Sequence, residues 1–105
     1  LEVDFSPLHA DQTARILGQY DFDAIGSSIH HLAGINIASR STREALKRTK
    51  PYELEIHFFE KMHAMLDYDY FDFICHLDIL KKFGTSLSDT WQKNMTQLME
   101  KIKMQ

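Results

Sequence analysis

The sequence has few of the features that mark specialised classes of protein. Its 105 residues include one cysteine, Cys75, which excludes an intramolecular disulfide and a cysteine-based zinc site. No apolar run approaches membrane-spanning length, and no basic region followed by an apolar stretch stands at the N-terminus. Lysine and arginine total 12 against 15 acidic residues, and their one cluster, within residues 40–50, is too local for a surface that binds nucleic acid. We expect a cytoplasmic protein that binds neither membranes nor nucleic acid, with Cys75 as a buried thiol.

The composition that remains is that of an ordinary folded domain. The hydrophobic share of 44% and the charged share of 26% argue against disorder. The length fits a single domain over residues 1–105 without an internal boundary. The chain opens at Leu1, directly in a strand-like run and without an initiator methionine. We therefore expect that this chain is a piece of a longer domain. The basic cluster within residues 40–50 is interpreted as the solvated face of a helix, with anion binding as the alternative.

Three strands are predicted, over residues 1–5, 22–30 and 70–77. The first alternates apolar and acidic residues with a period of two, which is typical of a half-buried strand. The third should place one set of side chains on one face (Phe71, Phe73, Cys75 and Leu77) and a second set on the other (Asp72, Ile74, His76 and Asp78). Long helices between the strands imply parallel β-α units rather than hairpins.

Helices are predicted between and after these strands. Ser6 and Pro7 are typical of a helix start, and that helix should run to about Leu17. A short helix is expected near 41–48, a long one over 51–66 and another short helical stretch over 78–82. The last helix should begin near Ser86 or Ser88 and pack through one apolar face: Leu87, Trp91, Met95, Leu98 and Ile102.

Chemically active side chains stand near the places where strands pass into loops. They are Glu2 and Asp4 in the first strand, His30 and His31 at the end of the second, and His76 and Asp78 at the end of the third. In β-α architectures, functional side chains gather at such places. Carboxylates and imidazoles from separate strands are suitable ligands for a divalent transition metal. The alternative is that each histidine simply caps a strand or hydrogen-bonds a neighbouring loop.

Three segments together carry a resemblance to a known family. They are LEVDFSP, YDFDAIGSSIHHLAG and YFDFICHLDILKKFG, within residues 1–84. In this order they resemble segments of the histidinol phosphatases of the polymerase and histidinol phosphatase (PHP) family. The usual sequences of those segments are close to GLEVDY-P, YDFDYVIGSVHHLDG and FDVIGHLDLIKRFG. The resemblance implies an α/β fold that forms part of a distorted (β/α)7 barrel. This chain would supply about three parallel β-α units and an extra C-terminal helix.

The resemblance also implies a metal-dependent phosphoesterase. The residues that match the family's metal ligands are Glu2, His30 and His76. Asp4 and Asp78 would orient ligands, and His31 is an alternative ligand because residues 26–30 hold one residue more than the family pattern. Divalent ions (Mn, Zn or Fe), more than one in a complete domain, would bind a small phosphate monoester such as histidinol phosphate and activate a water.

Departures from the family pattern lead to an alternative function. The family's H-x-H and final D-x-H pairs are missing here, and Cys75 replaces the glycine before the last matching histidine. These departures favour a non-catalytic remnant or interaction module, so whether this chain is itself an enzyme stays open. In either case about three β-α units cannot close a barrel. We expect a sheet with two exposed edges and self-association through them.

Overall fold

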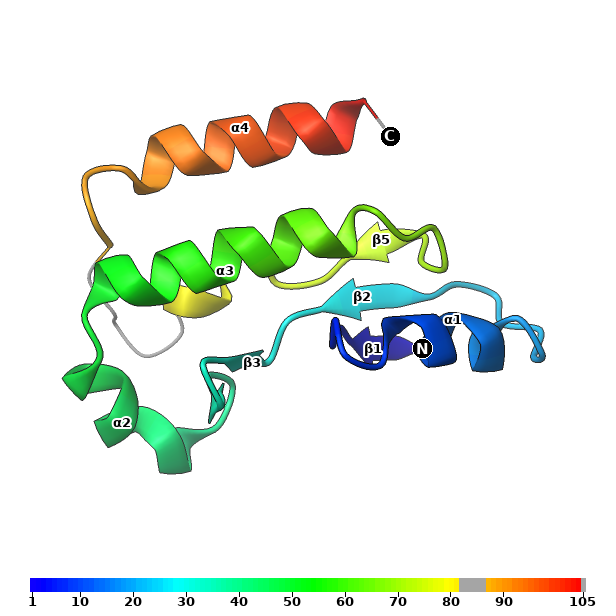
Figure 1. Cartoon of the computed structure of the whole chain (residues 1–105), viewed down its shortest axis with the longest axis horizontal. Helices are drawn as coiled ribbons and strands as arrows, with labels where there is room; N and C mark the ends of the chain where they lie inside the picture. The colour runs from blue at the N-terminus through cyan, green and yellow to red at the C-terminus, as the bar shows by residue number, and fades with distance from the viewer. Residues whose placement is uncertain (82–86, 105) are drawn as a thin grey trace.

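The computed structural model describes residues 1–81 and 87–104, which form a small α/β arrangement (Figure 1). Its main sheet consists of β1 (Glu2–Asp4), β2 (Gly26–Ser28) and β5 (Phe73–Ile74), in the order β1-β2-β5 with both pairs parallel. The predicted α/β class and the predicted parallel strands are therefore confirmed. The described residues form an open sheet and show no barrel.

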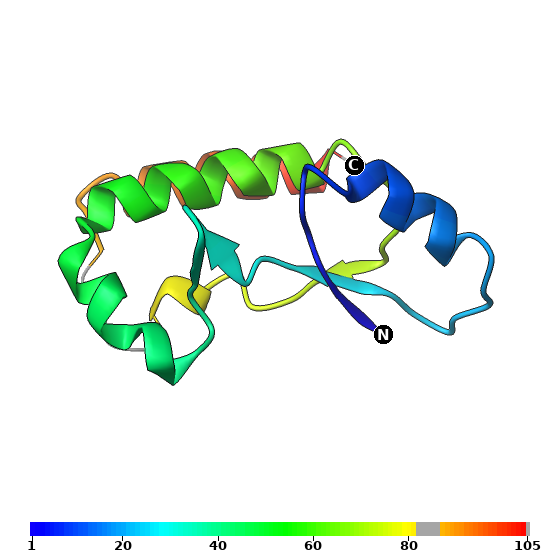
Figure 2. The same ribbon diagram turned by 60° about the horizontal axis from the view of Figure 1, so that its bottom comes forward.

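The register of the sheet separates a covered face from an open one. Val3 pairs with Ser27, and Ser27 pairs with Ile74, so these three side chains share one face. On that face the fully buried Ser27 hydroxyl donates a 3.0 Å hydrogen bond to the sulfur of Met65 in α3. Figure 2 shows α1 (Ala10–Leu17) and α3 (Pro51–Met65) on this same side of the sheet. The opposite face carries Glu2 and is left uncovered by the described helices.

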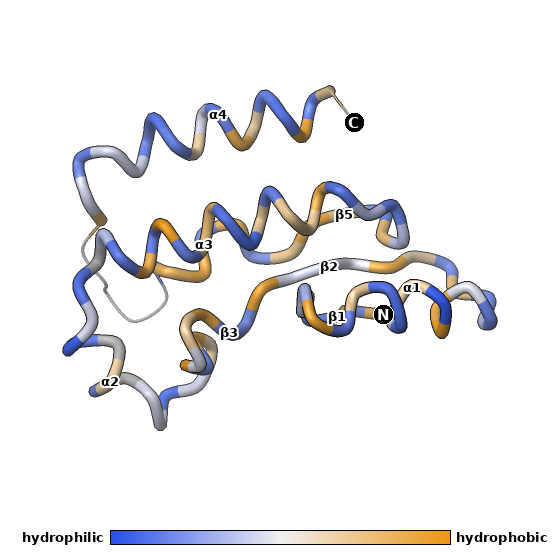
Figure 3. The backbone as a smooth tube through the Cα atoms, in the orientation of Figure 1, coloured by the Kyte–Doolittle hydropathy of each residue, from blue (hydrophilic) through white to orange (hydrophobic). Residues whose placement is uncertain are grey.

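Helix α3 is the centre of the hydrophobic core. It contacts β3 (His31–Leu32) and, through Met65, Ser27 of β2, and it also packs against α4 (Trp91–Lys103). The Trp91 ring lies 5.8 Å from the ring of Phe58 and 5.1 Å from that of Phe59, measured between centroids. Figure 3 shows the hydrophobic residues of α4 mainly along the edge turned toward α3. The predicted long helix and the predicted packing face of the last helix are thus found.

Helix boundaries near the termini differ from those predicted. The first helix begins at Ala10, because residues 7–9 form a turn in which Leu8 is 86% exposed. The last helix begins at Trp91; of the two predicted starts, Ser88 precedes the helix and Ser86 lies outside the described residues. The expected helical stretch over 78–82 is a 3-10 turn, η2 (Ile79–Lys81), and residue 82 also lies outside the described range.

The segment after β2 contains a hairpin that the sequence pattern did not predict. Strands β3 (His31–Leu32) and β4 (Ile35–Asn36) pair in antiparallel fashion. Ala33 and Gly34 connect them with φ angles of 50° and 78°, and two consecutive positive angles are what a tight hairpin turn requires. A 3-10 turn, η1 (Arg40–Thr42), and α2 (Arg43–Arg48) follow, close to the short helix expected over 41–48.

The third strand is much shorter than the predicted range of 70–77. Only Phe73 and Ile74 have strand geometry, so the predicted alternation of faces over the whole segment is wrong. Phe71 and Leu77 both pack against the core, as Ile74 does. Cys75, expected to be buried, is only partly so. None of the helices in the described ranges is both long and apolar enough to cross a lipid bilayer.

Candidate metal centre

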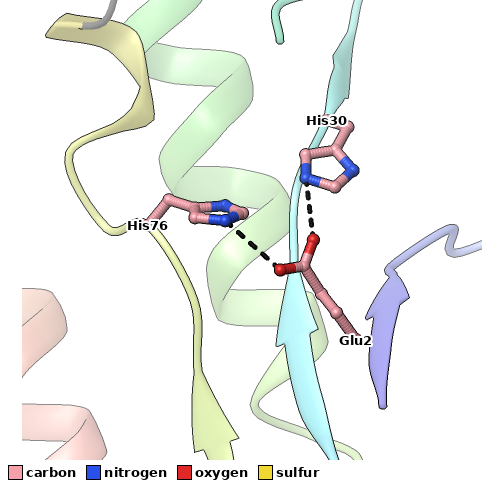
Figure 4. A group of neighbouring side chains, drawn as sticks. All are labelled: Glu2, His30 and His76. Atoms are coloured by element: carbon pink, nitrogen blue, oxygen red, sulfur yellow. Dashed lines mark ion pairs between the residues drawn. The ribbon is translucent and has the colours of Figure 1, made fainter.

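Glu2, His30 and His76 meet on the open side of the sheet (Figure 4). Each offers one ligand atom, and these atoms all lie within 4.8 Å of one another. The Glu2 carboxylate reaches both rings: one oxygen lies 3.2 Å from Nε2 of His30 and the other 3.3 Å from Nε2 of His76. The two imidazoles stack with 5.4 Å between centroids and 30° between planes. Three of the six residues singled out in the sequence therefore converge.

Beside Glu2, β2 carries a glycine, and its missing side chain leaves space that residues of the third strand segment fill. Glu2 pairs with Gly26, and Gly26 pairs in turn with Phe73. A Cβ atom at Gly26 would lie 2.6 Å from the Phe73 ring and 2.7 Å from the sulfur of Cys75, both closer than real contacts. The glycine thus leaves room for the side chains of Phe73 in β5 and of Cys75 directly after it to lie against β2 on the Glu2 side.

His30 is oriented by Asp4, the other acidic residue of β1. The Asp4 Oδ1 atom accepts a 2.8 Å hydrogen bond from the His30 backbone N–H, and its Oδ2 atom lies 3.0 Å from Nδ1 of His31. One carboxylate therefore holds two consecutive residues. As a result, the His30 ring lies beside Glu2, while the His31 ring is held by Asp4 away from the cluster. Lys61 of α3 fixes the same segment by donating a 2.7 Å hydrogen bond to the carbonyl of His31.

Two further ionisable groups, Lys61 near Asp4 and Cys75 near Glu2, have shifted pKa values. Burial lowers the pKa of Lys61, and the nearby charge of Asp4 partly opposes that shift. Burial raises the pKa of the Cys75 thiol, and the negative charge of Glu2 and a hydrogen bond to it raise this pKa further. Cys75 is thus held as a protonated thiol next to Glu2 rather than as a thiolate.

His76 reaches the cluster through an unusual backbone conformation. An extended chain would place His76 on the same face as Ile74, which is the face covered by helices. The φ angle of His76 is 43°, in the left-handed region, which costs a residue other than glycine about 1–2 kcal/mol. This turn directs the ring to the open face. The backbone N–H of Ile79 then donates to the His76 carbonyl at 3.0 Å and begins η2.

A pocket of about 510 Å³ lies directly beside the three side chains. Its lining consists of Glu2, His30, Ala38, His76, Asp78, Ile79 and Lys81. Asp78, expected near the site, thus lines the pocket without joining the group of three. Lys81 was missed by sequence reasoning. The signal that could have identified it is its place in the same short turn as His76.

The donor set suits a divalent transition metal. Two imidazoles and one carboxylate form the ligand set of several catalytic zinc and iron sites, which keep further positions open for water or substrate. The side chains are 41% exposed for Glu2, 25% for His30 and 42% for His76, so water has access to all three. Ser28 donates a 3.3 Å hydrogen bond to Glu2 and so orients the carboxylate.

Comparison with known proteins leaves this chain unassigned. No family model, no curated protein and no solved structure matches it.

Proposed function

We propose that this chain carries part of the metal centre of a phosphoesterase that hydrolyses small phosphate monoesters. The observation that carries the proposal is the meeting of Glu2, His30 and His76, each from a different strand or strand end, within 4.8 Å. If each histidine only capped a strand or bonded its own loop, the two rings would have separate partners. Instead both contact one exposed carboxylate, an arrangement that a cation stabilises and that the packing of the sheet does not need.

Each residue of the site would have its own role in metal binding. Glu2, His30 and His76 hold the ion, and Asp4 keeps His30 in place through its backbone N–H. A divalent ion such as Mn, Zn or Fe held by these residues would supply Lewis acidity and would lower the pKa of a bound water toward neutrality. The adjoining pocket leaves room for a phosphate group and a small organic substituent.

The PHP resemblance supplies the finer part of the proposal. We place the sheet β1-β2-β5 in a larger distorted barrel of seven β-α units, with the open face that bears Glu2 turned inward. The parallel order and the helices on a single face support that placement. Further ligands and further ions would then come from the rest of the barrel. Histidinol phosphate is the proposed substrate, and we expect little turnover from this chain alone.

Metal binding by single-residue variants tests the proposal. Isothermal titration with Mn²⁺ or Zn²⁺ should show that His30→Ala and His76→Ala weaken binding by at least about tenfold, since loss of even an outer partner costs that much. The control is His57→Ala, an exposed histidine of α3 outside the cluster. Unchanged metal affinity in His76→Ala, or an equal loss in His57→Ala, contradicts the proposal. Phosphate release from histidinol phosphate is measured on the same samples.

A second candidate function is a non-catalytic interaction module. The apolar side chains of Leu1, which precedes the edge strand β1, and of Phe73, in the edge strand β5, are 57% and 50% exposed and favour it. The coding region separates the two candidates. An H-x-H segment in frame upstream and a D-x-H segment downstream would mark this chain as a piece of an enzyme.

A further inference from the structure

Lys81 is held beside the three-residue cluster by the turn that follows His76. The backbone N–H of Ile79 donates to His76 at 3.0 Å, and that of Lys81 donates to Asp78 at 2.9 Å. Ile79 and Leu80, 7% and 4% exposed, anchor the turn in the core. The start of the Lys81 side chain is therefore fixed relative to the His76 ring, and both line the same pocket.

The charges that line the pocket make Lys81 important for any anion. Ligand imidazoles are neutral when they bind a metal. Among the described residues of the lining, the remaining charged groups are two carboxylates, Glu2 and Asp78, and one ammonium, Lys81, which sum to −1. One divalent ion changes this sum to +1. Without the Lys81 charge, the charges of this described lining and the ion would sum to zero, so Lys81 supplies the positive charge with which the lining attracts a phosphate dianion.

We propose that Lys81 is the phosphate-binding residue of this pocket, an inference that rests on the proposed metal centre. A lysine ammonium has three donors and acts as a compact positive charge for phosphoryl oxygens. It would take the oxygens that do not face the ion. Asp78 repels the dianion from its own part of the lining and so confines it to the space between the ion and Lys81. Ile79 offers an apolar wall to the organic part of a monoester.

We expect two results when inorganic phosphate is the probe. Binding should require the metal, because the pocket without it has a net negative charge. In the metal-loaded chain, Lys81→Gln should raise the Kd for phosphate about tenfold, which is the loss expected for one charge-assisted hydrogen bond at an exposed side chain. Lys81→Arg should largely restore the affinity. Metal affinity should be the same in all of these variants, since Lys81 is not a ligand.

The experiment titrates the full chain first with Zn²⁺ and then with phosphate. The width of the ³¹P NMR line measures phosphate binding in the second titration. Lys93→Gln, an exposed lysine of α4, is the matched control and should behave as wild type. A wild-type chain that binds no metal overturns the proposed function and this inference with it. Metal binding with equal phosphate affinity in wild type and Lys81→Gln overturns the role of Lys81 alone. Phosphate binding of equal strength without metal also overturns it.

Discussion

Two residues, Gly26 and His76, shape the region around Glu2 and His30. Gly26 acts through its missing side chain, and His76 acts through its backbone conformation. Gly26 leaves the space into which the Phe73 ring and the Cys75 sulfur fold. His76 turns its ring to the open face through a positive φ angle. A search for polar ligands alone finds His76 but not Gly26, which has no side chain, and it does not reveal the backbone angle that directs the His76 ring.

The close approach at Gly26 gives a prediction for Gly26→Ala. The added methyl group would lie under 3 Å from the side chains of Phe73 and Cys75, so these two side chains must shift. The expected cost is about 1–3 kcal/mol in the free energy of unfolding. Urea denaturation measures this change. The matched control is Gly18→Ala, where the nearest atoms are 3.5 Å away and φ is −67°, so stability should be equal or slightly higher. Equal stability of the two variants would refute the steric argument.

At the scale of elements, α3 organises the molecule because it has partners on both sides. Strand β3 and Ser27 of β2 contact α3, and α4 packs against α3 with Trp91 and Leu98 buried. Polar contacts close the far end of the α3–α4 pair: Lys101 donates a 3.1 Å hydrogen bond to the carbonyl of His63 and lies 3.6 Å from Asp67. His63 therefore titrates next to a positive charge.

The surroundings of His63 predict a pH dependence of stability. Burial lowers its pKa, the charge of Lys101 lowers it further, and Asp67 partly opposes both. The folded chain thus binds a proton at His63 less readily than the unfolded chain. As the pH falls below the ordinary value of 6.5, this site makes the free energy of unfolding decrease, and as the pH rises it makes stability recover.

Urea unfolding midpoints between about pH 5 and pH 8 measure the effect. His63→Gln should show a shallower loss of stability on acidification than wild type. Lys101→Met removes one cause of the shift, so the pKa of His63, followed by NMR, should rise toward its ordinary value. Identical pH profiles for wild type and His63→Gln would show that His63 does not contribute.

At the scale of the whole molecule, the sheet is open at both sides and on one face. In the described part of the chain, β1 and β5 each pair with β2 alone. Backbone groups at such edges are templates for further strands. The half-exposed Phe73 on β5 adds apolar surface at one edge.

We predict self-association that depends on this edge. Sedimentation velocity over a range of concentrations should show dimers or larger species for the wild-type chain, and Phe73→Lys should shift the population toward monomer, because an edge lysine opposes strand pairing. Tyr52→Lys, at a comparably exposed position on α3, should leave the distribution unchanged. A wild-type chain that stays monomeric at every concentration would contradict the prediction.

The order of strands and helices and the identity of the chemical groups follow from the sequence by itself. Period-two alternation around Glu2 and the apolar face of α3 and α4 are local patterns, and local patterns determine local structure. The hairpin of residues 31–36 escaped this reasoning because it depends on a positive φ at Ala33, a residue that ordinarily avoids it.

Only the tertiary structure decided which of these groups meet. Glu2 approaches His30 and His76 because of the register of three strands that are distant in the sequence. Asp4 accepts the His30 backbone N–H and holds the His31 ring away from the cluster. One backbone angle at His76 directs its ring to the open face of the sheet rather than into the core. The direction of a side chain at a strand end depends on non-local pairing and on a single dihedral angle. Periodicity along the chain carries no information about either.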